Sequence, residues 1–303
     1  MNYLYIINHQ HLFPYAIGIT YQQFEKILPK FSSALRSAEH KKAYEKIRLR
    51  DIGGGRKPTL RTDRQKLFFI LLYYKIYPTY RLAQVIYEFE YSNIFYWQKF
   101  LEKVLENTLG YELTLPTVKV SGLTMLFEVC PLLRNFIVDA TERRIQRPKD
   151  NKTQALYYSG KKKCHTVKNQ ILINPYNRKI LSISAAVFGT IHDKKLLEED
   201  GTIYRAPPNS QGLGDLGYLG AREDNPLLKF VTPLKKKAKI DLTEAEIATN
   251  KALSSVRVRV EHTFSYLKHF SILKNTYRGK DRRNNLFFKN IACLYNFSRD
   301  YRY

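Results

Sequence analysis

Apolar residues recur at helical spacing in the first third of the chain. They predict a helix over residues 21–35 and a second helix that begins near Thr62 or Asp63 and ends before Pro78. Between these two lies Gly53–Pro58, which is rich in glycine and basic residues and reads as a flexible loop. The N-terminal part of the chain is therefore predicted to be all helical.

Two short helices are predicted next, over residues 80–89 and 92–105, with a break at Glu90 and Tyr91. Ser92 is a favourable N-cap for the second of them. Two short helices joined by a tight break are typical of a helix-turn-helix. A plain helical bundle remains the alternative, because the break lacks the glycine that is common at such turns.

After Arg134 the pattern changes to that of strands. Residues 135–138 form an apolar run that ends at Asp139, and the segments 168–173 and 180–188 are rich in Ile, Val and Leu with a turn between them. The later elements are a helix at 193–197, a short glycine-rich segment at 212–220, a strand at 230–233 and a long helix at 243–270. This order predicts a mixed α/β sheet with helices on its faces.

The charge adds a partner to this picture. The 303 residues include 51 Lys and Arg against 27 Asp and Glu, a formal net charge of +24. A chain this basic usually meets a polyanion, so nucleic acid is expected, with acidic membranes as the alternative. No apolar run approaches the length that spans a bilayer, and the N-terminus lacks the features of a secretory signal. Cys130, Cys164 and Cys293 form no C-x-x-C pair, which argues against a disulfide scaffold or zinc knuckle and for a reducing compartment.

Three acidic residues stand out by their context. Asp139 ends an apolar strand, where open α/β sheets place their sites. Asp215 lies in the glycine-rich segment, whose backbone can approach a ligand closely, and Glu261 lies in the middle of the long helix. Carboxylate oxygens are the ligands that Mg²⁺ prefers, and two such ions can serve phosphoryl transfer. These three residues are the candidate catalytic and metal-binding residues.

Each of the three also has a plainer interpretation. Asp139 could cap a turn with Thr141, and Asp215 could be an ordinary turn aspartate. Glu261 could form a surface ion pair with Arg257, one helical turn earlier, worth about a few tenths of a kcal/mol. The residue types alone leave these alternatives open.

The residues around the three acids resemble the three blocks of bacterial insertion-sequence transposases of the DDE type. The matching segments are Ile137–Glu142, Gly214–Tyr218 and Arg257-x3-Glu261-x6-Lys268. The nearest group is the one that also resembles eukaryotic Harbinger-type elements, and Gly189–Asp193 and the region from Gly53 through the helix pair match it too. The resemblance covers roughly residues 50–300. Ser254 stands where related families often have a Tyr, three residues before the Arg of the third block.

The resemblance implies a fold, an activity and partners. It implies a ribonuclease H-like catalytic domain over 130–303, preceded by a helical segment over 1–52 and a helix-turn-helix DNA-binding region over 53–110. The expected activity is cleavage and strand transfer of double-stranded DNA at terminal inverted repeats and target, with two Mg²⁺ or Mn²⁺ ions. A homo-oligomer on paired ends, in the bacterial cytoplasm with the nucleoid, is expected. The alternatives are a non-catalytic DNA-binding protein derived from a transposase and a metal-dependent nuclease without strand transfer.

Further residues are candidates for DNA binding or for support of the site. Arg257 and Lys268 share a helix face with Glu261 and could hold a DNA phosphate or the carboxylate itself. Asp193 is predicted as the N-cap of its helix, with a part in the active site as the alternative.

In the DNA-binding region, Ser92, Asn93 and Tyr96 are expected near base edges, because they begin the predicted recognition helix. Four basic clusters are expected to meet the DNA backbone, with Tyr157 and Tyr158 available to stack on bases. The clusters are Arg143, Arg144, Arg147 and Lys149; Lys161, Lys162 and Lys163; Lys235, Lys236, Lys237 and Lys239; and Arg278–Arg283. Gly212-x-Gly214-x-x-Gly217 matches a dinucleotide-binding fingerprint, but the prolines around it do not suit a strand that leads directly into a helix. Spacing argues against ATP and zinc-protease sites.

Overall fold

The computed structural model describes residues 3–44, 58–110, 135–201, 210–221, 228–236, 241–279 and 283–301. The chain divides into two compact units. Unit 1 comprises Met1–Glu112, Lys268–Asn275 and Asp281–Tyr303, and unit 2 comprises Leu113–Leu267 and Thr276–Lys280. The predicted loop Gly53–Pro58 lies outside the described residues except for Pro58. No helix in the described ranges is both long enough and apolar enough to cross a membrane.

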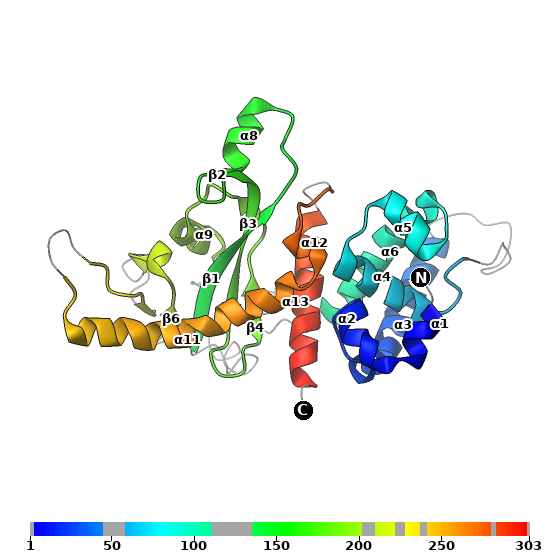
Figure 1. Cartoon of the computed structure of the whole chain (residues 1–303), viewed down its shortest axis with the longest axis horizontal. Coiled ribbons are helices and arrows are strands. Elements are labelled where there is room, and N and C mark those ends of the chain that lie inside the picture. The colour runs from blue at the N-terminus through cyan, green and yellow to red at the C-terminus, as the bar shows by residue number, and fades with distance from the viewer. Residues whose placement is uncertain are drawn as a thin grey trace. The chain divides into compact units, whose positions relative to one another are not determined.

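Unit 1 is built from helices alone within the described residues (Figure 1). Its elements are α1 (Tyr3–Asn8), η1 (Gln10–Leu12), α2 (Phe13–Ile17), α3 (Tyr21–Tyr44), α4 (Asp63–Ile76), α5 (Tyr80–Tyr87), α6 (Tyr91–Leu109), α12 (Ser271–Lys274) and α13 (Asn284–Asp300). Helix α4 packs against α2, α3, α6 and α12. Every residue from Lys66 to Tyr74 is buried, so α4 is the central helix of the unit rather than one with a single apolar face.

The two ends of α4 agree with the boundaries predicted from the sequence, whereas the start of α6 does not. Thr62 forms a capping box with Gln65, and Tyr77 ends α4 in the left-handed conformation just before Pro78. Helix α6 begins at Tyr91 with Glu90 at its N-cap and no side-chain cap bond, so the prediction of Ser92 as N-cap is wrong. Trp97 is buried as expected, whereas Ser92, Asn93 and Tyr96 are exposed.

Unit 2 is a mixed sheet with helices beside it, which confirms the α/β prediction. Its strands are β1 (Asn135–Arg144), β2 (Tyr158–Ser159), β3 (Cys164–Ile173), β4 (Ile180–Ile183), β5 (Val187–Phe188), β6 (Gln211–Leu213) and β7 (Lys229–Val231). The strand order is β2-β3-β1-β6-β7, with β4 and β5 also on β3. Strand β3 is antiparallel to β1, β2, β4 and β5, whereas β1, β6 and β7 run parallel.

Helical elements complete unit 2. They are α8 (Asn151–Tyr157), α9 (Asp193–Glu199), η5 (Leu216–Tyr218) and α11 (Glu244–Lys268). Helix α11 crosses the sheet, and α8 projects past the ends of β2 and β3 (Figure 1). Nine residues form one apolar cluster that joins the sheet to α9 and η5: Phe136, Val138, Leu172, Leu181, Leu197, Tyr218, Ala221, Leu228 and Phe230. This cluster thus fixes the segments that carry Asp139 and Asp215.

Two strand predictions need correction. Strand β1 does not end at Asp139 but continues to Arg144, because its antiparallel pairing with β3 runs on from Ile137 to Arg144. The segment 180–188 forms two short strands rather than one, since β4 and β5 pair with different parts of β3. The long helix also ends at Lys268, two residues earlier than expected.

Candidate active site

Asp139 and Asp215 are brought together by the parallel strands β1 and β6. The pairing ends with Ile137 opposite Leu213. Asp139 follows Ile137 by two residues within β1, and Asp215 follows Leu213 by two residues, just after β6 has ended. The charge of Asp215 raises the pKa of Asp139, so the two aspartates lie close together. Asp139 therefore lies in the middle of β1, but at the point where its neighbour β6 has ended.

Burial and neighbouring carboxylates act on Asp139. The pKa of Asp139 is raised from 3.8 to about 6; burial is the largest cause, and the charges of Asp215 and Asp193 contribute to the rise. The Ala140 N–H, which donates to Asp139 Oδ1 at 2.8 Å, and the charge of Arg257 oppose this rise in pKa. Asp139 thus belongs to a group of carboxylates with one arginine close by.

Asp215 is fixed by its own turn. Its carboxylate caps η5, accepting a hydrogen bond at 2.8 Å from the Gly217 N–H. A Cβ at Gly217 would lie 2.9 Å from both Asp215 Oδ1 and Asp193 Oδ2, so these two carboxylates border the same glycine. The glycines before Asp215 serve another purpose: a Cβ at Gly212 or Gly214 would clash with core aromatic rings. These two glycines are therefore required for the packing of the core beside Asp215.

We predict that Gly217→Ala disturbs the pair of aspartates more than it destabilises the fold. A methyl group 2.9 Å from two carboxylate oxygens must push at least one of them away. We expect affinity for Mn²⁺, followed by electron paramagnetic resonance, to fall by about 10–100-fold, as when a partner behind a metal ligand is removed. Gly160→Ala is the matched control, because nothing lies within 4 Å of a Cβ there. Equal Mn²⁺ affinity in the two variants would contradict the prediction.

Asp193 does not cap its helix, so that prediction is wrong. His192 occupies the N-cap position of α9, and Asp193 is the first residue of the helix. Its carboxylate faces the site instead: Oδ1 accepts a hydrogen bond at 2.8 Å from the Nζ of Lys168, and Oδ2 borders Gly217. The alternative of a part in the site is the one that this geometry favours.

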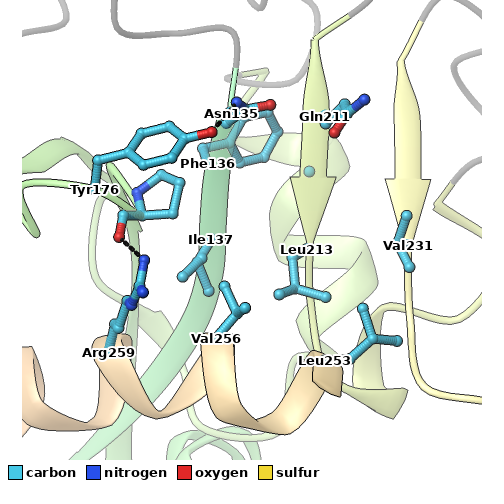
Figure 2. A pocket seen from close by; sticks show the side chains of 12 residues that line it. Asn135, Phe136, Ile137, Tyr176, Gln211, Leu213, Val231, Leu253, Val256 and Arg259 are labelled. Atoms are coloured by element: carbon cyan, nitrogen blue, oxygen red, sulfur yellow. Dashed lines mark hydrogen bonds between the residues drawn. The ribbon is translucent and has the colours of Figure 1, made fainter. Parts of the chain in front are cut away.

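Arg257 and Glu261 belong to helix α11, which lies beside β1 and β6 (Figure 2). Figure 2 shows Val256 and Leu253 of α11 pointing toward Ile137 and Leu213, the residues two places before Asp139 and Asp215. These side chains line an apolar pocket of about 300 Å³. Arg259 donates to the Pro175 carbonyl at the rim of this pocket. This hydrogen bond ties α11 to the turn that precedes β4.

Arg257 and Glu261 form an ion pair in this structure. Arg257 Nη2 lies 3.2 Å from Glu261 Oε1, and the Glu261 side chain is 55% exposed against 20% for Arg257. Val260, Phe264 and Leu267 fill the buried face of α11, as expected. Lys268 is the last residue of α11 and the first of a segment that belongs to unit 1. The structure thus brings Asp139, Asp193 and Asp215 together, with Glu261 joined to Arg257.

The described ranges contain no group of three or more His, Cys, Asp or Glu side chains that could hold a metal ion as they stand. The donor set nevertheless suits a hard divalent ion at Asp139 and Asp215, because both are carboxylates and their mutual repulsion contributes to the raised pKa of Asp139. Glu261 would have to exchange its arginine partner for a metal ion before it could join them.

Two residues of the site were missed by the sequence reasoning. Lys168 lies on β3 with a buried side chain, and its position inside an apolar strand is the signal that could have found it. Tyr218 is fully buried, and its hydroxyl donates to Gln170 Oε1 at 3.1 Å. Burial raises the pKa of Tyr218 well above its usual value, and the three aspartates raise it further, so the tyrosine stays protonated beside them.

The predicted DNA-contacting residues have varied surroundings. Lys161, Lys162 and Lys163 form the exposed turn between β2 and β3. Tyr96 is 41% exposed, and its hydroxyl accepts a hydrogen bond at 2.7 Å from Lys42. Arg143 does not belong to a basic surface: it is buried and donates to Asn169, and burial lowers its pKa to about 9.

The other predicted DNA-contacting residues also include both exposed side chains and side chains that pack or pair within the protein. Tyr157 packs edge-on against Phe188, while Tyr158 remains 44% exposed. Lys235 and Lys236 are exposed, whereas Lys237 and Lys239 lie outside the described residues. In the fourth cluster, Arg278 is exposed and Arg283 pairs with Glu102.

Comparisons with known proteins agree with the resemblance. Residues 138–296 match the family described as DDE superfamily endonuclease. A probable transposase for insertion sequence element IS702 from Microchaete diplosiphon is 34% identical over 168 residues, which are 55% of this chain and 58% of that protein. The match thus spans little more than half the length of that relative. No solved structure is significantly similar to the chain. The predicted resemblance to DDE-type insertion-sequence transposases is confirmed, and the chain belongs to the DDE superfamily endonuclease family.

Proposed function

We propose that the chain is a DNA transposase that cleaves the ends of its element and joins them to target DNA, with Asp139, Asp215 and Glu261 as its catalytic residues. The observation that carries this proposal is the side-by-side placement of Asp139 and Asp215 at the end of the parallel pairing. The family generally uses divalent metal ions. The mixed sheet with its flanking helices supports a ribonuclease H-like catalytic domain.

Each residue of the proposed site would have a separate role. Asp139 and Asp215 would hold the metal ions, Mg²⁺ or Mn²⁺, and Glu261 would complete the site after leaving Arg257. Bound divalent ions would supply activation of the attacking oxygen and stabilisation of the leaving oxygen. Arg257, once released by Glu261, can hold a phosphate of the DNA through its fixed fork of donors. Tyr218 behind the aspartates keeps its proton at neutral pH, so it does not serve as a base.

DNA contact is proposed for both units, each considered by itself. In unit 1 the pair α5 and α6 provides the proposed helix-turn-helix, with Ser92 and Asn93 exposed at the start of α6. In unit 2 the exposed Lys161–Lys163 turn provides positive charge beside Tyr158. Terminal inverted repeats are the proposed specific target, and assembly on paired ends as a homo-oligomer is part of the proposal.

Strand cleavage on authentic ends tests this function directly. The wild-type chain is incubated in Mg²⁺ or Mn²⁺ with a fragment that carries the inverted repeats flanking its own gene, and the nicked strands are mapped. We expect cleavage at the element boundary, followed by strand transfer into a second DNA. Cleavage without transfer would indicate a nuclease, and binding without cleavage would indicate a DNA-binding protein that has lost catalysis.

DNA affinity is predicted to fall steeply with salt. Each phosphate contact contributes a slope of roughly −0.9 in the logarithm of affinity against the logarithm of salt concentration. Replacing Lys161, Lys162 and Lys163 by Gln should flatten the slope by roughly 1 for each lysine that binds a phosphate. Lys195→Gln is the control, because this exposed lysine faces Glu199 at 3.6 Å. A slope near zero for the wild type between about 50 and 200 mM salt would remove DNA as the main partner.

A further inference from the structure

Lys168 is a buried lysine in the antiparallel strand β3. Its side chain is 9% exposed, and its Nζ donates to Asp193 Oδ1 at 2.8 Å and to the Ile191 carbonyl at 2.6 Å. A buried ammonium is tolerated only when it is paired and hydrogen-bonded. The two contacts therefore tie the start of α9 to the middle of the sheet.

Asp193 lies between Lys168 and the proposed active site. While its Oδ1 accepts from Lys168, its Oδ2 borders Gly217, at 2.9 Å from the place of a Cβ there. The N–H of the same glycine donates to Asp215 Oδ1 at 2.8 Å. Hydrogen bonds thus join Lys168 to Asp193 and Gly217 to Asp215, and the Asp193 carboxylate lies next to Gly217 between them.

We propose that Lys168 is a positioning residue, which holds Asp193 against Gly217 and thereby keeps Asp215 beside Asp139 before any cation is bound. The inference rests on the proposed function, because it takes Asp139 and Asp215 as the metal-binding pair. The Nζ of Lys168 is directed to Asp193 and the Ile191 carbonyl rather than to either member of that pair. Its effect on metal binding is therefore indirect.

The sign of one measurement separates positioning from simple electrostatics. If Lys168 acted only as a nearby positive charge, its removal would make the site more negative and increase affinity for a divalent cation. If Lys168 positions Asp215, its removal should decrease that affinity. Loss of a partner behind a metal ligand typically decreases affinity by about 10–100-fold.

The test compares Lys168→Met, Lys168→Arg and Lys195→Met in the full chain. Met keeps much of the length but removes the charge and both donors, whereas Arg keeps the charge. Lys195→Met is the matched control, because Lys195 forms an exposed pair with Glu199 on the same helix, α9. Hydrogen exchange of the segment 210–221 is measured in EDTA, and Mn²⁺ affinity is measured by electron paramagnetic resonance, with thermal unfolding recorded for each variant.

We expect Lys168→Met to exchange faster in 210–221 than the wild type, without a matching change in β1, and to bind Mn²⁺ about 10–100-fold more weakly. Lys168→Arg should recover much of both properties, and Lys195→Met should resemble the wild type. Unchanged exchange in 210–221, or tighter Mn²⁺ binding, would overturn the inference.

Two further measurements keep the inference testable. If Lys168→Met does not fold, Asp193→Asn replaces it: the charge-assisted bond, roughly twice as strong as a neutral one, is lost while the size is kept. Faster exchange in 210–221 supports the inference, and unchanged exchange refutes it. If Asp215→Asn binds Mn²⁺ as well as the wild type, the proposed function fails, and the exchange comparison in EDTA still decides the role of Lys168.

Discussion

Glu261→Gln is expected to reduce strand cleavage by about a hundredfold or more, while the fold and DNA affinity barely change. A neutral amide oxygen is a much poorer ligand for a hard divalent ion than a carboxylate, and removal of one stabilising group at a reacting phosphate has effects of this size. The stability should hardly respond, because the Glu261 side chain is 55% exposed and an exposed helix pair contributes only about 0.3–0.5 kcal/mol.

The measurement follows cleavage and gel-shift affinity on the same end fragment in Mg²⁺. Glu244→Gln serves as the matched control, since Glu244 is an exposed glutamate in the first turn of the same helix. Binding should be retained or rise slightly in Glu261→Gln, because one negative charge has gone. Unchanged cleavage would show that Glu261 serves only as the partner of Arg257.

Asp139→Asn is expected to abolish metal-dependent cleavage and yet to stabilise the metal-free fold at neutral pH. The pKa of Asp139 is raised from 3.8 to about 6, chiefly by burial, so ionising this carboxyl costs more free energy in the folded chain than in the unfolded chain. One unit of pKa corresponds to about 1.4 kcal/mol. The charged form of Asp139 should therefore cost up to roughly 3 kcal/mol of unfolding free energy at pH 7, which the uncharged Asn avoids.

The pH dependence follows from the direction of this shift. The raised pKa contributes stability that is present below pH 3.8 and is lost as the pH rises through about 6. The difference in unfolding free energy between Asp139→Asn and the wild type should thus be near zero at about pH 4 and largest above about pH 6. Denaturant unfolding in EDTA at several pH values measures it, with Asp150→Asn as control. Neighbouring Thr153 lowers the pKa of Asp150, so its substitution should not stabilise the protein.

The sequence predicted those features of the fold that depend on residues close together in the chain. The capping box at Thr62, the end of α4 before Pro78 and the apolar face of α11 follow from neighbouring residues along the chain. The length of β1 could not be predicted in this way, because it is set by pairing with β3, a strand that follows later in the chain, beyond α8 and β2. The same holds for α4, whose burial on all sides is a property of the helices around it.

The site was partly predictable for a related reason. Motifs single out Asp139, Asp215 and Glu261, and the register of two parallel strands brings the two aspartates together. The pairing of Asp193 with Lys168 links residues on different elements and leaves no periodic signal. The sequence around Asp193 predicts an N-cap, but in the structure Asp193 is the first residue of α9 and its carboxylate pairs with Lys168.

The two edges of β1 are occupied differently along its length. On one edge β3 accompanies it throughout, while on the other β6 stops at Ile137 and Tyr277 meets the chain again at Arg144 and Gln146. Among the described residues, no strand pairs with this edge of β1 between Ile137 and Arg144, and Asp139 lies near the start of that unpaired stretch. The Ala140 N–H there is occupied by Asp139 Oδ1. Within the described residues, the Asp139 carboxylate thus accepts from a peptide N–H in the stretch of β1 that lies beyond its pairing with β6.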